Sequence, residues 1–252
     1  FLYEKKGEGV AFTDDEQQEW DRVVARYHGV CKLAKEKDVE VLIDAEESWM
    51  QDAADELVEE MMCQYNTEKA IVYNTLQTYR WDRLDYVKEL HTRSIKGNFK
   101  LGMKIVRGAY MEKERERAED KRYASPICKD KEATDTNFND TQTYILNNLN
   151  DISLFVGTHN EESSYLAMEQ MEALNIAKND NRVWFGQLYG MSDHISFNLA
   201  KAGYNVAKYV PFGPVKDVMP YLIRRAEENT SVAGQTNREL NLLKQEKKRR
   251  KV

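Results

Sequence analysis

The chain has 252 residues, of which 41% are hydrophobic, enough for one large domain or two small ones with a buried core. Lysine and arginine nearly balance aspartate and glutamate, and the net charge of −6 excludes a general attraction to nucleic acid or anionic lipid. No apolar run reaches the roughly 18 residues that a membrane-spanning helix requires.

Short apolar strands alternate with amphipathic helices along the chain. This alternation predicts an α/β fold with a parallel sheet and right-handed crossovers. Residues 1–37 are expected to be a helical connection that leads into the first strand. The expected strands lie at 39–44, 70–75, 101–108, 152–160, 182–188 and 205–213, and the helices that follow them lie at 50–64, 80–96, from 111, 161–174, 192–202 and from 214.

Two segments depart from this alternation. Residues 115–139 have the composition of a long polar connection after the third strand, and long connections of this kind in barrels are commonly functional. Residues 230–252 have the composition of a charged tail that ends in a basic run, for which a solvated chain end is favoured over a localisation signal. The main domain is therefore assigned to residues 38–229.

Every expected strand ends in polar or glycine-rich residues, and ligands of parallel α/β folds bind at these ends. Polar groups at all the strand ends favour a barrel over a doubly wound sheet, and no GxGxxG follows any strand. Six strands cannot close an eight-stranded barrel, so two more strands are expected before residue 1. The strand ends read DAEE, NTLQ, RGAY, GTHN, QLYG and PFGP.

Several single residues could carry chemistry, but each also has a structural explanation. Asp44 is the last residue of a strand, at the expected rim of the barrel. It is a candidate catalytic acid, and the structural alternatives are a helix cap or an ion-pair partner. Lys104 lies inside an apolar strand, on the same face as Val106. Arg224 and Glu228 share a helix face that is either solvated or built to bind a carboxylate. Because the cysteines and histidines show no metal-type spacing, no metal site is expected.

Taken together, these motifs resemble the proline dehydrogenase family. The resemblance runs from about residue 42 to residue 229 and implies a distorted (βα)8 TIM barrel with FAD at the carboxyl ends of the strands. The family's last helix lies over the barrel mouth, which here corresponds to residues 214–229. The family's first two strands, one with a substrate-binding lysine, have no counterpart in this chain. The motifs are DAEE (44–47), KIVRGAY (104–110), THN (158–160), QLYGM (187–191), KYVPFGPV (208–215) and YLIRRAEEN (221–229).

The resemblance implies how the substrate is bound. Arg224 and Arg225 bind the carboxylate of proline, which matches the planar donor geometry of guanidinium groups, and Glu228 steadies one of them. Tyr209 favours proline itself, since relatives that accept hydroxyproline carry a smaller residue there. Tyr209 and Tyr221 pack on the proline ring, and Leu188 supplies an apolar wall. The implied catalytic residues are Asp44, Lys104, Tyr209, Arg224, Arg225 and Glu228.

The cofactor residues also follow from the resemblance. Lys104 is placed near N5 of the flavin, where a positive charge stabilises the reduced ring, and Asp44 orders the cationic groups around the substrate. Gln77 contacts the isoalloxazine ring, and Lys131 lies near the phosphate or adenine end. The remaining cofactor positions are Ala45, Val106, Arg107, Gly108, Ala109, Tyr110, Thr158, His159, Asn160 and Gln187.

The implied activity is the FAD-dependent oxidation of L-proline to 1-pyrroline-5-carboxylate, with hydride passing to N5 and electrons to a quinone, by an enzyme of the monofunctional type. A quinone acceptor implies peripheral membrane association, at the cytoplasmic face of the inner membrane in bacteria or the matrix side of the inner membrane in mitochondria. Two alternatives remain: another barrel enzyme that acts on a small carboxylate, and a non-catalytic relative of the family.

Overall fold

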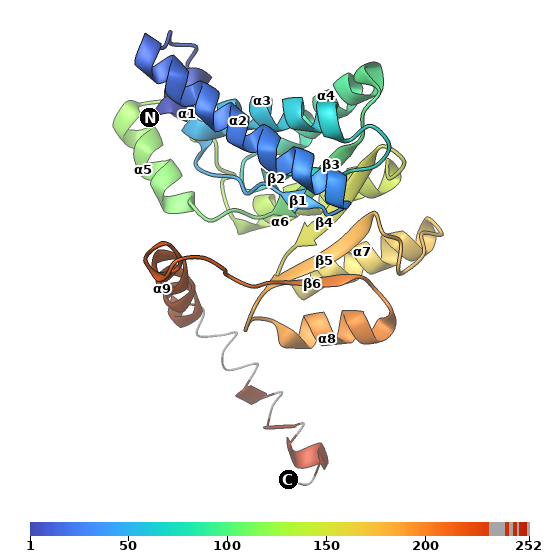
Figure 1. The fold of residues 1–252 in the computed structure, drawn as a ribbon. Coiled ribbons are helices and arrows are strands. Elements are labelled where there is room, and N and C mark those ends of the chain that lie inside the picture. The colour runs from blue at the N-terminus through green and yellow to red at the C-terminus, as the bar shows by residue number, and fades with distance from the viewer. Residues whose placement is uncertain (232–239, 242–243, 246, 251–252) are drawn as a thin grey trace. The chain divides into compact units, whose positions relative to one another are not determined.

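The computed structural model describes residues 1–231, 240–241, 244–245 and 247–250, with the side chains of the last helix described up to residue 223. Six strands in this part of the chain form one parallel sheet in the order β1-β2-β3-β4-β5-β6 (Figure 1). Each strand overlaps its predicted range, so the six predicted strands are confirmed. The strands are β1 Val41–Leu42, β2 Val72–Gln77, β3 Leu101–Val106, β4 Ile152–Gly157, β5 Val183–Leu188 and β6 Val206–Tyr209.

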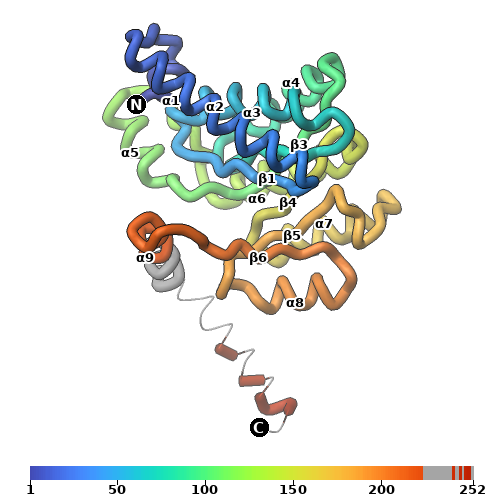
Figure 2. The backbone as a smooth tube through the Cα atoms, viewed as in Figure 1, coloured from blue at the N-terminus to red at the C-terminus, as the bar shows by residue number. Residues whose placement is uncertain are grey.

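One or two helices connect each strand to the next, as expected of parallel strands joined by crossovers. Before β1, helices α1 and α2 pack against α3 (Figure 2). None of the described helices has the length and apolar content needed to cross a bilayer. The helices are α1 Leu2–Gly7, α2 Asp14–Lys37, α3 Ser48–Tyr65, α4 Arg83–Gly97, α5 Met111–Lys121, α6 Lys131–Asn147, α7 Glu161–Ala173, α8 Asp193–Ala202 and α9 Val215–Ser231.

The prediction of a long polar connection over residues 115–139 is wrong. Most of it is helical, because α5 continues to Lys121 and α6 begins at Lys131. The carboxylate of Asp130 caps α6 by accepting a hydrogen bond from the backbone N–H of Ala133 at 2.8 Å. Phe138, fully buried, anchors the helix on the sheet.

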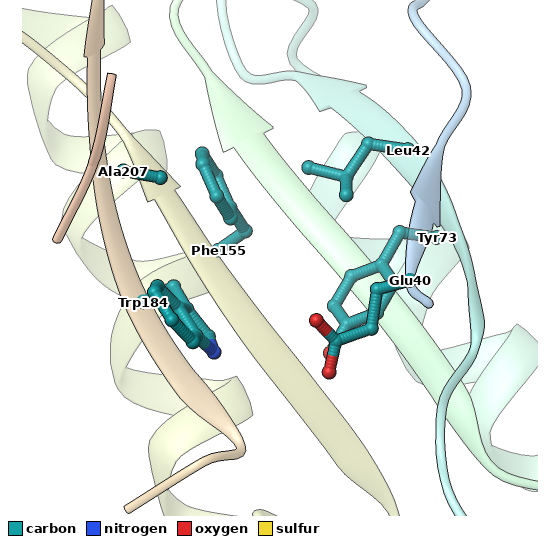
Figure 3. A pocket seen from close by; sticks show the side chains of 6 residues that line it. All are labelled: Glu40, Leu42, Tyr73, Phe155, Trp184 and Ala207. Carbon is teal, nitrogen blue, oxygen red and sulfur yellow. The ribbon is translucent and has the colours of Figure 1, made fainter. Parts of the chain in front are cut away.

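The hydrophobic core lies between the outer face of the sheet and its helices. Alternate strand residues, such as Met103 and Ile105 of β3 and Leu154 and Val156 of β4, are fully buried there. The opposite, inner face belongs to a curled half-barrel and lines a half-open cavity of about 180 Å³ (Figure 3). The cavity is lined by Glu40, Leu42, Tyr73, Phe155, Trp184 and Ala207.

The chain divides into two compact units, Phe1–Lys208 and Tyr209–Val252. The first contains nearly all of the sheet, and the second begins at the last residue of β6 and contains α9. The placement of α9 over the barrel mouth stays a prediction, as do the proposed boundaries at residues 37 and 229. Most of the predicted tail, 230–252, lies outside the described residues.

Candidate functional site

An ion pair joins the ends of β1 and β3. Lys104 Nζ donates a hydrogen bond to Oδ1 of Asp44, across the intervening strand β2. Within β3, Lys104 and Val106 are half-buried on one face, whereas Met103 and Ile105 are buried on the other, which confirms the predicted alternation. The Lys104 side chain is 15% exposed and that of Asp44 is 53% exposed. The ammonium group therefore lies at the strand ends, with a counter-ion open to solvent.

The connection after β1 fixes the side chain of Gln77 at the end of β2. Gln77 is buried, and its Nε2 donates to the backbone oxygen of Glu46 at 2.6 Å. The backbone N–H of Glu46 donates to Gln51 at 3.0 Å, and its carboxylate accepts a hydrogen bond from the hydroxyl of Tyr110 at 2.7 Å. Ala45 lies in the same connection, next to Glu46. Three predicted cofactor residues, Gln77, Tyr110 and Ala45, are thus grouped around Glu46. Glu46 itself was not among the residues predicted from the sequence.

Arg107, directly after β3, is fixed on several sides. Its Nε donates to Oδ1 of Asp135 at 2.7 Å, and its two terminal nitrogens donate to the hydroxyls of Thr158 at 2.8 Å and Ser163 at 3.0 Å. The guanidinium carbon lies 4.4 Å from the centre of the Phe138 ring. The ends of β3 and β4 are therefore joined to the starts of α6 and α7.

Lys131, the first residue of α6, shares the same carboxylate. Its Nζ donates to Oδ2 of Asp135 at 2.5 Å. Burial alone would raise the pKa of Asp135, but hydrogen bonds from Lys131 and Arg107 outweigh it and lower the pKa below its usual range. Asp135 is therefore ionised at neutral pH and neutralises one of the two cations.

The ends of β4 and β5 are also joined by hydrogen bonds. Nε2 of Gln187, a buried side chain, donates to the backbone oxygen of Thr158 at 3.2 Å. Ser196, in α8, donates its hydroxyl to Oε1 of Gln187 at 2.8 Å. Leu188 follows Gln187 and is half-buried at the end of β5. Gln187 and Thr158, both predicted cofactor residues, are thus in direct contact.

The THN motif leads from β4 into α7. Asn160 caps this helix, with its side-chain oxygen accepting the backbone N–H of Ser163 at 2.9 Å. Nδ1 of His159 lies 2.9 Å from the hydroxyl oxygen of Ser192. A cap and a polar contact explain both residues structurally, in addition to any contact with a cofactor.

Gly108 and Ala109 are exposed in the turn between β3 and α5. Gly108 has a φ of 132°, and a Cβ added there would lie 2.5 Å from the ring of Tyr79. A glycine is required here for the backbone to pass this ring.

The second unit contains the residues predicted to bind substrate, except Leu188, which lies in the first unit. The rings of Tyr209 and Tyr221 have centroids 5.7 Å apart at an angle of 47°, so the two tyrosines predicted to pack on proline contact each other. Arg224, Arg225 and Glu228 belong to α9, but their side chains lie outside the part that the structure describes.

The cavity of the inner face is separate from the site residues of the first unit. Tyr73 and Trp184, which line it, lie near the amino ends of β2 and β5. Among the residues whose side chains the structure describes, none of the predicted site residues lines the cavity, and we therefore place the candidate site at the carboxyl ends of the strands.

Comparison with known proteins agrees with this fold. A proline utilization A (PutA) protein from Bdellovibrio bacteriovorus, in a structure inactivated by N-propargylglycine, superposes with a TM-score of 0.79 at 28% identity. The match covers 86% of this chain and 22% of that protein. The six-stranded half-barrel thus corresponds to part of a distorted TIM barrel, and the predicted fold class is confirmed.

Sequence comparisons cover nearly the whole chain. Carbapenem antibiotics biosynthesis protein CarD of Pectobacterium carotovorum is 38% identical over 100% of this chain, and human mitochondrial proline dehydrogenase 1 is 40% identical over 92%. The chain spans 64% of the length of the first relative and 39% of the second. Residues 3–238 match the family model described as proline dehydrogenase. These matches explain the order of the strand-end motifs, and they show that the chain belongs to the proline dehydrogenase family.

Proposed function

We propose that the protein oxidises L-proline to 1-pyrroline-5-carboxylate with FAD as its cofactor. The main support is that residues assigned to FAD by resemblance occupy neighbouring strand ends of one sheet. Gln77 ends β2, Arg107 and Thr158 directly follow β3 and β4, Lys104 lies in the carboxyl half of β3, and Gln187 lies near the end of β5. A flavin dinucleotide is long enough to contact several adjacent strand ends at once.

The donor set fits this cofactor. Three of the five N–H groups of Arg107 have partners among the described residues, which leaves donors for a phosphate oxygen. Lys131 lies beside it on the shared carboxylate, so Arg107 and Lys131 would bind the pyrophosphate. Gln77, with its Nε2 bonded to Glu46, would offer its side-chain oxygen to the isoalloxazine ring.

FAD, when bound, supplies the hydride acceptor and passes the electrons on to a quinone. Lys104 would provide a positive charge to the flavin ring, and Asp44 would orient it through their ion pair. Arg224 and Arg225 would bind the carboxylate of proline, while Glu228 steadies one of them. Tyr209, Tyr221 and Leu188 would enclose the apolar ring of the substrate.

The proposed quinone acceptor also implies where the protein is located. A quinone acceptor requires contact with a membrane surface, which is peripheral in this proposal. Several curated relatives are named as mitochondrial, which supports a mitochondrial location if the source is eukaryotic. A bacterial source would instead place the protein at the cytoplasmic face of the inner membrane.

The absorbance spectrum of the purified protein tests the proposal directly. We expect a visible flavin band that bleaches when L-proline is added without oxygen, and proline-dependent reduction of an artificial dye. D-proline is the matched control and should leave the band unchanged. A protein with neither flavin nor dye reduction would be a non-catalytic relative, and bleaching by a different small carboxylate would identify another barrel enzyme.

The substitution Arg225→Met tests the arginine pair. Loss of a two-pronged carboxylate contact should raise the KM for proline by about tenfold or more while FAD stays bound. Steady-state kinetics with a dye acceptor measure the KM for proline, and the flavin-to-protein absorbance ratio measures the bound FAD. The matched control is Lys216→Met, an exposed cation in the first turn of the same helix, which should keep the wild-type KM. An unchanged KM in Arg225→Met would refute carboxylate binding by this residue.

A further inference from the structure

One carboxylate, near the start of α6, joins two cations from different segments. Asp135 accepts a hydrogen bond from Arg107 Nε on Oδ1 at 2.7 Å and from Lys131 Nζ on Oδ2 at 2.5 Å. Each cation uses its own oxygen, so the guanidinium and the ammonium lie on either side of a single carboxylate group. Lys131 is 80% exposed and would otherwise move freely in solvent.

Arg107 is held rigidly by its other contacts. The hydroxyls of Thr158 and Ser163 accept from its terminal nitrogens, and the ring of Phe138 lies against its plane. Ser163 is also fixed, because its hydroxyl donates to Asn139 at 2.8 Å. The open N–H groups of Arg107 therefore have a defined direction before any ligand arrives.

The charge at this cluster favours an anion. Arg107 and Lys131 carry two positive charges against the one negative charge of Asp135, and the first turn of α7 adds the positive end of a helix dipole. Of the two acidic residues in that turn, Glu161 contacts His194 at 2.8 Å and Glu162 is exposed.

We propose that Asp135 is a positioning residue, which orders Arg107 and Lys131 so that together they bind the pyrophosphate of FAD. This inference rests on the proposed FAD-dependent function. It predicts the direction in which the affinity for FAD changes when Asp135 is replaced. If Asp135 only neutralised the cations, its removal would strengthen the binding of an anion, since a negative charge is lost. If it orders them, its removal weakens binding, because Lys131 becomes mobile, Arg107 loses the partner of its Nε, and the ligand must then fix both side chains.

The test is the substitution Asp135→Asn in the whole protein, with FAD and riboflavin titrated into the apoprotein and followed by flavin fluorescence. We expect the Kd for FAD to rise by about tenfold, the cost of roughly one charge-assisted contact. The Kd for riboflavin, which has no phosphate, should stay within about twofold. The matched control is Asp140→Asn, an exposed carboxylate on the same helix, which should change neither Kd.

An unchanged or lower Kd for FAD in Asp135→Asn would overturn the inference. An equal loss of riboflavin affinity would also overturn it, since the defect would then lie in the fold. A second experiment repeats the substitution in an Arg107→Met, Lys131→Met background. There it should change the Kd for FAD by less than about twofold, because the residues through which Asp135 acts are gone. A further tenfold loss in that background would contradict the proposed route.

The results separate this inference from the proposed function. A wild-type protein that binds no FAD contradicts both. FAD binding that survives Asp135→Asn unchanged contradicts the inference alone. FAD binding that is weakened as expected, in a protein that does not oxidise proline, contradicts the proposed activity alone.

Discussion

Asp82, at the start of α4, accepts hydrogen bonds from two buried arginines. Arg80 donates to it through Nε at 3.1 Å and a terminal nitrogen at 2.6 Å, and Arg83 does so at 2.9 and 2.8 Å. Burial alone would raise the pKa of Asp82, but these hydrogen bonds, with those of Arg83 first, lower it to about 2. The folded pKa is below the unfolded value, so the carboxylate stabilises the fold above that value, and this stability is lost as the pH falls towards 2.

The substitution Asp82→Asn should therefore lower the free energy of unfolding by about 2 kcal/mol at neutral pH. Urea unfolding measures this difference, which should shrink as the pH falls from about 4 towards 2. Asp85→Asn is the matched control, since Asp85 lies in the same turn with its side chain 80% exposed, and it should change stability by less than about 0.5 kcal/mol. A difference between wild type and Asp82→Asn that persists at low pH would contradict this explanation.

Single residues also differ in how far the sequence predicts their roles. The apolar strand around Lys104 marks this lysine as unusual, and the structure shows it paired with Asp44. Asp135 gives a weaker signal, because a Lys–Asp pair four residues apart is common on exposed helices. Its contact with Arg107, 28 residues away in the sequence, is visible only in three dimensions.

At the scale of an element, the turn from β3 to α5 depends on one glycine. Gly108 has a φ of 132° and passes the ring of Tyr79, which is fully buried. The backbone of Tyr79 is fixed on both sides, since its N–H donates to the oxygen of Arg107 and its oxygen accepts from the N–H of Cys128, both at 2.6 Å. Because the ring is fully buried and its backbone is fixed, the ring has little space in which to move away from a larger residue at 108.

The substitution Gly108→Ala should destabilise the protein by about 3 kcal/mol, through an unfavourable φ and a clash with the ring. Gly29→Ala is the matched control: no other atom lies within 4 Å of its added Cβ, and Gly29 is inside helix α2. It should raise stability by about 0.5–1 kcal/mol, because alanine favours the helix. Thermal unfolding measures both. An equal gain from the two substitutions would show that the Tyr79 contact is not limiting.

Strands and most helices were predictable, whereas α6 was not. The strands are continuous apolar runs between turn residues, a local pattern that survives folding. Helix α6 contains the sequence EATDTNFND, whose threonines and asparagines have low intrinsic helix propensity. It buries Thr134 and Thr141 beside Phe138, and the Thr141 hydroxyl donates to the backbone oxygen of Asn137 at 2.7 Å. Tertiary packing thus overrides the local preference.

At the scale of the whole molecule, ligand binding should stabilise the fold. FAD at about 100 times its Kd adds about 2.7 kcal/mol to the free energy of unfolding. For a chain of this size, the Tm should then rise by roughly 5–10 °C. A thermal shift assay with FAD measures the change, and NAD, a dinucleotide without a flavin, is the control. An equal shift with NAD would show that binding depends on the nucleotide alone.

The sequence by itself determined the family, the positions of the strands along the chain and the polar residues at their ends, because these depend on short runs of residues. Only the tertiary structure decided which polar groups pair with one another. Lys104 and Asp44 are 60 residues apart, and Arg107 and Thr158 are 51 apart. Such contacts form because parallel crossovers bring the carboxyl ends of neighbouring strands to one edge of the sheet, where side chains from distant segments come within hydrogen-bonding distance.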